Sequence, residues 1–349
     1  MDLAALTHPI VQAPLAGGPS TPELAVAVSE AGGLGFLAAG YRSADDLRAD
    51  IAAVRSRTAA PFGVNLFVPS AGQVDRAAVD AYAARLRAEA ERHGVELGAP
   101  ADDDDAWQAK LAVVTEERVP LVSFTFGLPA REVIEQVRAA GASVAVTVTT
   151  PDEAVAAHAA GADILVAQGI EAGGHRGGFT DDAGDYGLLT LLRLVLRATP
   201  LPVVAAGGIA DGAGVAAVLV AGAVAAQLGT AFLRCPEAGT SAAHREALGS
   251  YDRTAVTRAF TGRRARGLVN RFLREHSEEA PAAYPQVHHL TAPLRAAGRK
   301  AGDASVVNLW AGQAHRLAEE VPAGELVRRL AAEARESLER ATHHPNTPA

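Results

Sequence analysis

One histidine lies in a stretch that is almost free of other large side chains. His175 follows Gly173 and Gly174 and precedes, after Arg176, another glycine pair at 177–178. The apolar run 164–167 before this stretch predicts a buried strand, which places the histidine in a loop at the end of that strand. Imidazole transfers protons near neutral pH, and glycines let a backbone approach a ligand closely. The pattern predicts an active-site loop against a flat cofactor, in which Arg176 either steadies an anionic substrate or faces solvent.

Two further strand ends have the composition of a phosphate site. The predicted strand 203–207 leads into Gly207 and Gly208, and the predicted strand 223–229 ends in Gly229, followed by Thr230. Both ends offer backbone N–H groups, and Thr230 adds a hydroxyl. Because phosphates in barrels favour the loops after the seventh and eighth strands, we expect these two ends to act together.

Two amide side chains stand on apolar strands, where an unsatisfied amide costs free energy. Asn65 lies within the predicted strand 62–68, and Gln168 ends the predicted strand 163–168. Each amide either makes a structural hydrogen bond to a neighbouring loop or contacts a ligand at the strand ends. The first predicted strand, 10–14, also runs into a loop of small residues, 12–19, on the same side.

The elements that must position these groups alternate regularly along the chain. Helix-start signals of threonine, proline and acidic residues occur at 21–23 and 150–153, and glycines end helices at 32, 141, 161 and 222. Several strands are continuously apolar, which is typical of a parallel sheet buried on both faces. The pattern predicts an α/β fold, a (β/α)8 TIM barrel, with a doubly wound open sheet as the alternative. The eight predicted strands are 10–14, 34–39, 62–68, 121–126, 143–149, 163–168, 203–207 and 223–229.

Two regions interrupt this alternation and predict a smaller cap or substrate domain. We expect a barrel over 1–235 with a cap insertion at 70–117, a cap over 236–310, and a C-terminal helix within 311–349 that packs back on the barrel. The arginines between 263 and 274 are expected on the solvated surface of the cap.

Composition narrows the class of protein. The 349 residues are 49% hydrophobic and 21% charged, which is enough for a large core. A net charge of −8 argues against a nucleic-acid or anionic-membrane surface. Cys235 is the sole cysteine, so no intrachain disulfide is expected. We found no signal peptide, no membrane-length apolar run, no metal-ligand spacing and no complete dinucleotide fingerprint, and we expect a cytoplasmic protein.

The motifs in this order resemble the nitronate monooxygenases over nearly the whole chain. The resemblance extends to 264–267, Asn270 and the segment 308–313, which is similar to bacterial class I members. It implies an FMN-dependent TIM barrel in which His175 is catalytic. Leu15 departs from the methionine that many members have beside the flavin, but leucine has a similar volume. The residues expected to bind the cofactor are Pro14, Leu15, Ala16, Asn65, Gln168, Gly173, Gly174, Gly207, Gly208, Gln227, Leu228, Gly229 and Thr230.

The resemblance implies oxidation of alkyl nitronates, such as propionate 3-nitronate, by FMN and O2 to a carbonyl product and nitrite or nitrate. The alternative is an NAD(P)H-dependent FMN reductase of the enoyl-acyl-carrier-protein or quinone reductase type, and a third interpretation is a flavin-binding protein without catalysis. The expected partners are a small-molecule nitronate and O2, without nucleic acid or membrane, and a homodimer is one expected assembly.

Overall fold

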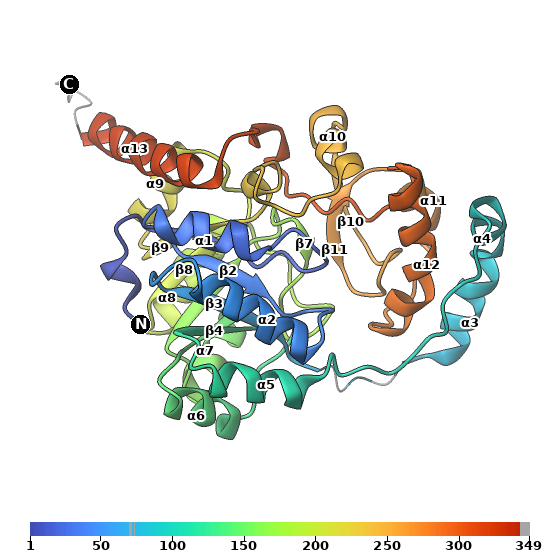
Figure 1. The fold of residues 1–349 in the computed structure, drawn as a ribbon, viewed down its shortest axis with the longest axis horizontal. Coiled ribbons are helices and arrows are strands. Elements are labelled where there is room, and N and C mark those ends of the chain that lie inside the picture. Colours follow the sequence, from blue (N-terminus) through green and yellow to red (C-terminus); the bar gives the residue numbers. More distant parts are fainter. Residues whose placement is uncertain (70–71, 73, 343–349) are drawn as a thin grey trace.

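Eight parallel strands form the centre of the computed structural model, which describes residues 1–69, 72 and 74–342 (Figure 1). Each strand lies within its predicted range and is slightly shorter. Their order in the sheet is β1-β9-β8-β6-β5-β4-β3-β2. Their bounds are β1 Ile10–Gln12, β2 Gly35–Ala38, β3 Phe62–Phe67, β4 Leu121–Thr125, β5 Ser143–Val148, β6 Ile164–Gln168, β8 Val203–Ala206 and β9 Ala225–Leu228.

The sheet closes on itself between β1 and the residue before β2. The backbone N–H of Gln12 donates to the carbonyl of Leu34, and the N–H of Leu34 donates to the carbonyl of Ile10, both at 2.9 Å. The predicted TIM barrel is confirmed, and the open-sheet alternative is wrong. Most strand residues are buried on both faces, as the continuous apolar runs predicted.

Helices cover the outside of the barrel and begin where the sequence predicted. Thr21 caps the first helix by accepting a hydrogen bond from the N–H of Leu24 at 3.0 Å. Thr150 and Glu153 form a reciprocal capping box at the start of α7. The barrel helices are α1 Pro22–Glu30, α2 Ala44–Arg55, α5 Trp107–Glu116, α6 Arg131–Ala139, α7 Pro151–Ala160, α8 Leu188–Ala198 and α9 Gly212–Val220, with the short 3₁₀ helices η1 Leu3–Ala5, η2 Thr230–Phe232 and η3 His315–Leu317.

The segment 70–117 divides between two parts of the molecule, and residues 70, 71 and 73 lie outside the described residues. The helices α3 Arg76–Arg85 and α4 Arg87–His93 pack against α12 Gln286–Ala301. The Tyr82 hydroxyl in α3 donates to the carbonyl of Ala259 at 2.8 Å. By contrast, α5 packs against α2, α6 and β3, in the position of a barrel helix (Figure 1).

The segment after β9 supplies most of a smaller layer, and we use the term cap for residues 242–301 together with α3 and α4. Its elements are α10 Ala242–Ser250, β10 Thr254–Thr257, β11 Ala265–Leu268, α11 Arg271–His276 and α12. The strands β10 and β11 are antiparallel, and β11 also pairs with β7, Gly174–His175. The prediction of a loop around His175 is therefore wrong at residues 174–175, which form a short strand. Ala265 pairs with His175, and Arg266 pairs with Gly174.

Two arginines of the cap do not lie on its surface as expected. Arg263 and Arg266 are only 4% and 6% exposed. Arg263 donates to the carbonyls of Arg176 and Gly178, and Arg266 donates to the carbonyl of Ile170 at 3.0 Å. The expectation failed because these acceptors lie 85 to 96 residues earlier in the chain, and no local pattern shows that the two segments are close.

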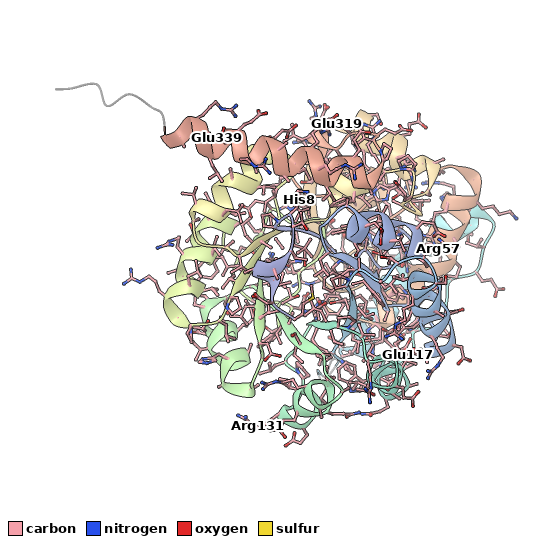
Figure 2. All side chains as sticks on the ribbon, turned by 60° about the vertical axis from the view of Figure 1, so that its left-hand side comes forward. His8, Arg57, Glu117, Arg131, Glu319 and Glu339 are labelled. Atoms are coloured by element: carbon pink, nitrogen blue, oxygen red, sulfur yellow. The ribbon has the colours of Figure 1, made fainter. Side chains whose placement is uncertain are left out.

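The C-terminal helix α13, Ala323–Thr342, packs against α9 and α1 on the outside of the barrel. Figure 2 shows it running along one edge of the molecule with Glu339 near its C-terminal end, while Arg131 lies at the opposite edge. Of the expected terminal segment, residues 343–349 lie outside the described residues. No helix in the described part of the chain is long and apolar enough to cross a membrane.

Candidate functional site

A cavity of about 430 Å³ opens where the barrel strands end, between the barrel and the cap. Twelve of the thirteen residues expected to bind a cofactor line it, together with His175. The exception is Leu228, whose buried side chain packs in the hydrophobic core. The expected residues in the lining are Pro14, Leu15, Ala16, Asn65, Gln168, Gly173, Gly174, Gly207, Gly208, Gln227, Gly229 and Thr230.

The ends of β8 and β9 form an anion cradle on one side of the cavity. Gly207 and Gly208 have φ angles of 108° and 72°, a backbone conformation that other residues rarely adopt. Among the described residues, the backbone N–H groups of Gly207, Gly208 and Gly229 have no acceptor. Free backbone donors at the ends of two neighbouring strands are a common arrangement for binding a phosphate.

The segment after the cap packs tightly against this cradle. The N–H of Gly312 donates to the Thr230 hydroxyl at 2.9 Å. A Cβ at Gly173 would come within 2.4 Å of the backbone nitrogen of Gly312, so only glycine fits at position 173. The Thr230 hydroxyl therefore accepts a hydrogen bond within the protein, and it is also a candidate donor to a bound phosphate.

Asn65 fits both roles that its sequence position allowed, a structural hydrogen bond and a contact to a ligand. Its Oδ1 accepts hydrogen bonds from the hydroxyls of Ser123 and Thr125, at 2.8 and 2.9 Å. These bonds fix the orientation of the amide. The Nδ2 group has no acceptor among the described residues, so its two hydrogens are available to a ligand in the cavity.

Gln168 holds the histidine segment in place. Its Oε1 accepts from the N–H of Gly177 at 2.8 Å and from Arg176 at 3.2 Å, and its Nε2 donates to the carbonyl of His175 at 3.1 Å. Arg176 is 3% exposed and also donates to the carbonyl of Gly169 at 2.7 Å. Of the two expected roles for Arg176, neither fits its position: the guanidinium is buried and supports the backbone.

His175 lies half-buried among aromatic rings at the cavity wall. The rings of Phe126, Trp310 and Tyr284 have centroids 5.5, 5.4 and 5.9 Å from the imidazole. Burial, together with the positive charges of Arg263 and Arg295, lowers the pKa of His175 to about 3. The ring is therefore neutral at neutral pH.

One hydrogen bond orients this neutral ring. His175 Nε2 lies 2.9 Å from the Thr261 hydroxyl, which lies 3.3 Å from the carbonyl of Arg263. When the hydroxyl donates to that carbonyl, it accepts from Nε2–H. Nδ1 then has a free lone pair, and it has no partner among the described residues.

Several cavity residues were missed by the sequence analysis. Tyr41, Phe126 and His288 line the cavity but come from segments with no recognisable motif. Trp310 had a signal, because it lies within the segment 308–313 that carried the resemblance. For Arg295 and Arg299 the only sequence signal was their spacing on one helix. That spacing does not identify cavity residues until the position of the helix is known.

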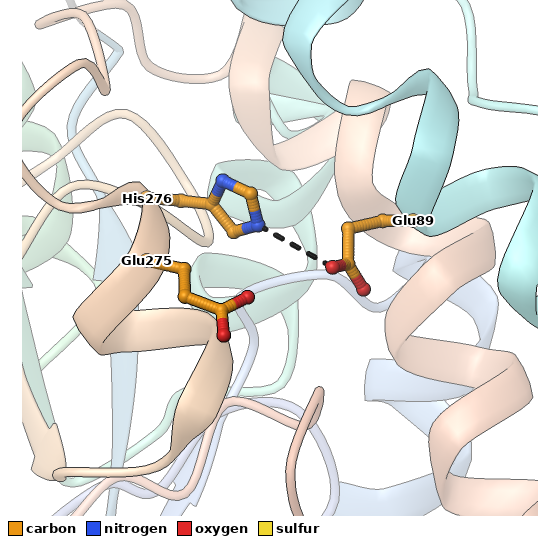
Figure 3. Close-up of side chains that lie close together, drawn as sticks. All are labelled: Glu89, Glu275 and His276. Atoms are coloured by element: carbon orange, nitrogen blue, oxygen red, sulfur yellow. Dashed lines mark ion pairs between the residues drawn. The ribbon is translucent and has the colours of Figure 1, made fainter.

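A second polar cluster lies in the cap, away from this cavity. Glu89, Glu275 and His276 converge there (Figure 3), with His276 Nε2 3.7 Å from Glu89 Oε1. Arg271 already contacts both oxygens of Glu89, at 2.6 and 2.8 Å. Because a guanidinium repels a metal cation, we interpret the cluster as an ion-pair network that joins α4 to α11.

Comparison with known proteins gives a consistent result. Residues 1–333 match the family model described as nitronate monooxygenase. The chain is 42% identical to the nitronate monooxygenase of Paraburkholderia phytofirmans, over 99% of this chain and 97% of that one. It is 44% identical to the Pseudomonas aeruginosa nitronate monooxygenase, over 95% and 98%.

Among solved structures, the nitroalkane oxidase of Streptomyces ansochromogenes is similar with a TM-score of 0.95. The two chains are 55% identical over 97% of this chain and 99% of the other. FabK from Thermotoga maritima is similar with a TM-score of 0.78 and 31% identity, over 98% and 97% of the two chains.

Proposed function

The chain belongs to the nitronate monooxygenase family, and we propose that it oxidises alkyl nitronates with FMN and O2 in the cavity described above. The observation that carries this proposal is the presence, in one cavity, of a free anion cradle and a neutral histidine.

The residues present fit FMN, the flavin that we infer for this flavin-dependent family. The free N–H groups of Gly207, Gly208 and Gly229 would hold its phosphate, and the Asn65 amide would donate to a carbonyl or ring nitrogen. The cavity volume is within the usual range for small-molecule sites. When bound, the flavin would supply the redox chemistry, while the protein orients the substrate and excludes water.

His175 would act on the substrate by a hydrogen bond rather than by a charge. A pKa of about 3 makes the imidazole a weak base at neutral pH, far from the match to operating pH that general-base catalysis favours. This favours a substrate that arrives already deprotonated, which is a nitronate. A neutral nitroalkane, as the name of the Streptomyces relative indicates for that protein, is the second candidate, and the free Nδ1 lone pair supports it.

Two measurements test this function. The first identifies the cofactor: the flavin released on denaturation should co-elute with FMN and not with FAD in chromatography. A colourless protein that cannot be reconstituted with FMN would contradict the proposal.

The second measurement separates the monooxygenase from the reductase alternative. With propionate 3-nitronate we expect O2 consumption without NADH. Under anaerobic conditions, nitronate should bleach the flavin spectrum. If NADH bleaches it rapidly and nitronate leaves it oxidised, the NAD(P)H-dependent reductase is the better description.

A further inference from the structure

The helix α12 presents a stripe of four residues to the cavity. His288, Ala292, Arg295 and Arg299 line it, at intervals of four, three and four residues, which is one face of a helix. Two of the four are arginines. None of the described residues that line the cavity is an aspartate or glutamate. The cap side of the cavity is therefore positively charged in a protein whose net charge is −8.

Arg295 is the more enclosed of the two arginines, at 5% exposure. Its Nε donates to the Thr291 hydroxyl at 3.0 Å, and its Nη2 donates to the carbonyl of His288 at 2.7 Å. These bonds fix the guanidinium plane. Its third nitrogen, Nη1, has no acceptor among the described residues, and no carboxylate pairs with the group.

A buried guanidinium without an anion is unusual, because burial of an unpaired charge is costly. The titratable groups around Arg295 are Tyr41, Tyr284, Arg299 and the neutral rings of His175 and His288, and none of them is an anion at neutral pH. The anion cradle at Gly207, Gly208 and Gly229 consists of backbone N–H donors, so it supplies no negative charge to Arg295. A cavity ligand can supply the missing anion.

We propose that Arg295 is the residue that binds the negative charge of the substrate, with the nitronate oxygens as acceptors of the Nη1 hydrogens. This proposal rests on the proposed function, since it takes the nitronate as the anion. Arg299, which is exposed and only 3.4 Å from Asn308 Oδ1, adds positive potential at the cavity mouth.

His175 and Arg295 then have different roles toward the substrate. His175 cannot supply a positive charge because its ring is neutral, so it contributes hydrogen-bond geometry. Arg295 supplies charge throughout the neutral pH range, because burial lowers its pKa only to about 10. Substrate affinity should then be independent of histidine protonation.

Nitrate is a suitable probe, because it is a planar monoanion with the oxygen geometry of a nitronate and it is not oxidised. Its dissociation constant can be measured on the flavin-loaded protein by titration, from the change in flavin absorbance. We expect Arg295→Met to weaken nitrate binding about 10- to 100-fold, as for loss of a charge-assisted hydrogen bond. Arg295→Lys, which keeps the charge, should recover part of the affinity.

Lys300→Met is the matched control, since it removes a positive charge from the same helix at an exposed position outside the cavity lining. It should leave nitrate affinity unchanged. Thermal unfolding of each variant shows whether it is folded, and Arg295→Lys provides the test if Arg295→Met is not.

Three results would overturn the proposal. The first is wild-type nitrate affinity in a folded Arg295→Met variant, and the second is an Arg295→Lys variant that loses as much nitrate affinity as Arg295→Met. The third is a nitrate affinity that falls about tenfold per pH unit between pH 6 and 8, as expected if a titrating histidine supplied the charge. If the wild type binds nitrate through Arg295 but oxidises no nitronate, the proposed function fails while the anion site remains.

Discussion

At His175, burial and two neighbouring arginines act in the same direction on the pKa, which distinguishes this ring from a surface histidine. We expect His175→Ala to retain flavin, because the predicted flavin contacts are backbone and amide groups. Because the neutral ring orients the anion by a hydrogen bond, KM for nitronate should rise with a smaller change in kcat. A fall in kcat of about 10²- to 10⁴-fold at unchanged KM would show instead that the ring transfers a proton.

The wild-type pH profile provides an independent check on the same residue. With a pKa of about 3, His175 should produce no inflection in kcat/KM between pH 5 and 8. An inflection near pH 6.5 that His175→Ala abolishes would show that the ring titrates normally, and it would remove the support for a nitronate that arrives already deprotonated.

Gly229 tests the anion cradle. A Cβ at this position would lie 3.2 Å from Leu15 Cδ2 and 3.4 Å from Ala13 Cβ, so a branched side chain must displace the cradle or enter the cavity. We expect Gly229→Val to lower flavin occupancy, measured as the flavin-to-protein absorbance ratio. Gly249→Val is the control, because Gly249 is exposed on α10 and a Cβ there would have no other atom within 4 Å. Equal occupancy in both variants would place the phosphate site elsewhere.

At the scale of elements, the ion pair between α4 and α11 should contribute to the stability of the cap. Glu89 is 4% exposed, and Arg271 contacts both of its oxygens. Arg271→Met leaves the buried carboxylate with the half-exposed Arg92, at 3.0 Å, as its remaining arginine partner. We expect the free energy of unfolding to fall by up to about 3–5 kcal/mol, the typical cost of breaking a buried pair. Adding Glu89→Leu should recover most of the loss.

The surface pair of Arg340 and Glu336 is the control for this cycle, since both side chains are about two-thirds exposed. Arg340→Met should change the free energy of unfolding by less than about 0.5 kcal/mol in denaturant titrations. Equal effects of Arg271→Met and Arg340→Met would show that the buried pair contributes no more to the free energy of unfolding than the exposed pair does.

For the whole molecule, three enclosed histidines predict acid sensitivity. Burial lowers the pKa of His175 to about 3, that of His244 to about 4 and that of His288 to about 2. Below pH 6.5 the unfolded chain binds protons that the folded protein excludes, so stability falls as pH falls. Each histidine contributes at most about 1.4 kcal/mol per pH unit, until the folded pKa is reached.

Denaturant titrations at pH 7, 6 and 5 measure this slope. His244→Asn should reduce it, whereas His158→Asn, at an exposed position on α7, should not. A free energy of unfolding that does not change between pH 7 and 5 would contradict the neutral state assigned to these rings.

Features that depend on local order could be predicted from the sequence. The apolar runs, the caps at Thr21 and Thr150 and the helix-ending glycines specified eight strands in a barrel, because each acts on residues a few positions away. Barrel geometry brings all the strand ends to one face. The glycines at 207, 208 and 229 could therefore be placed in one site before the structure was known.

The groups that surround this site could not be predicted in the same way, because they come from distant segments of the chain. The pairing of His175 with Ala265, the burial of Arg263 and the position of Arg295 at the cavity join segments 80 to 120 residues apart. From sequence, an arginine is expected on the surface, since most arginines are exposed. Its burial depends on backbone carbonyls and cavity walls that distant segments supply, and no local periodicity encodes that arrangement.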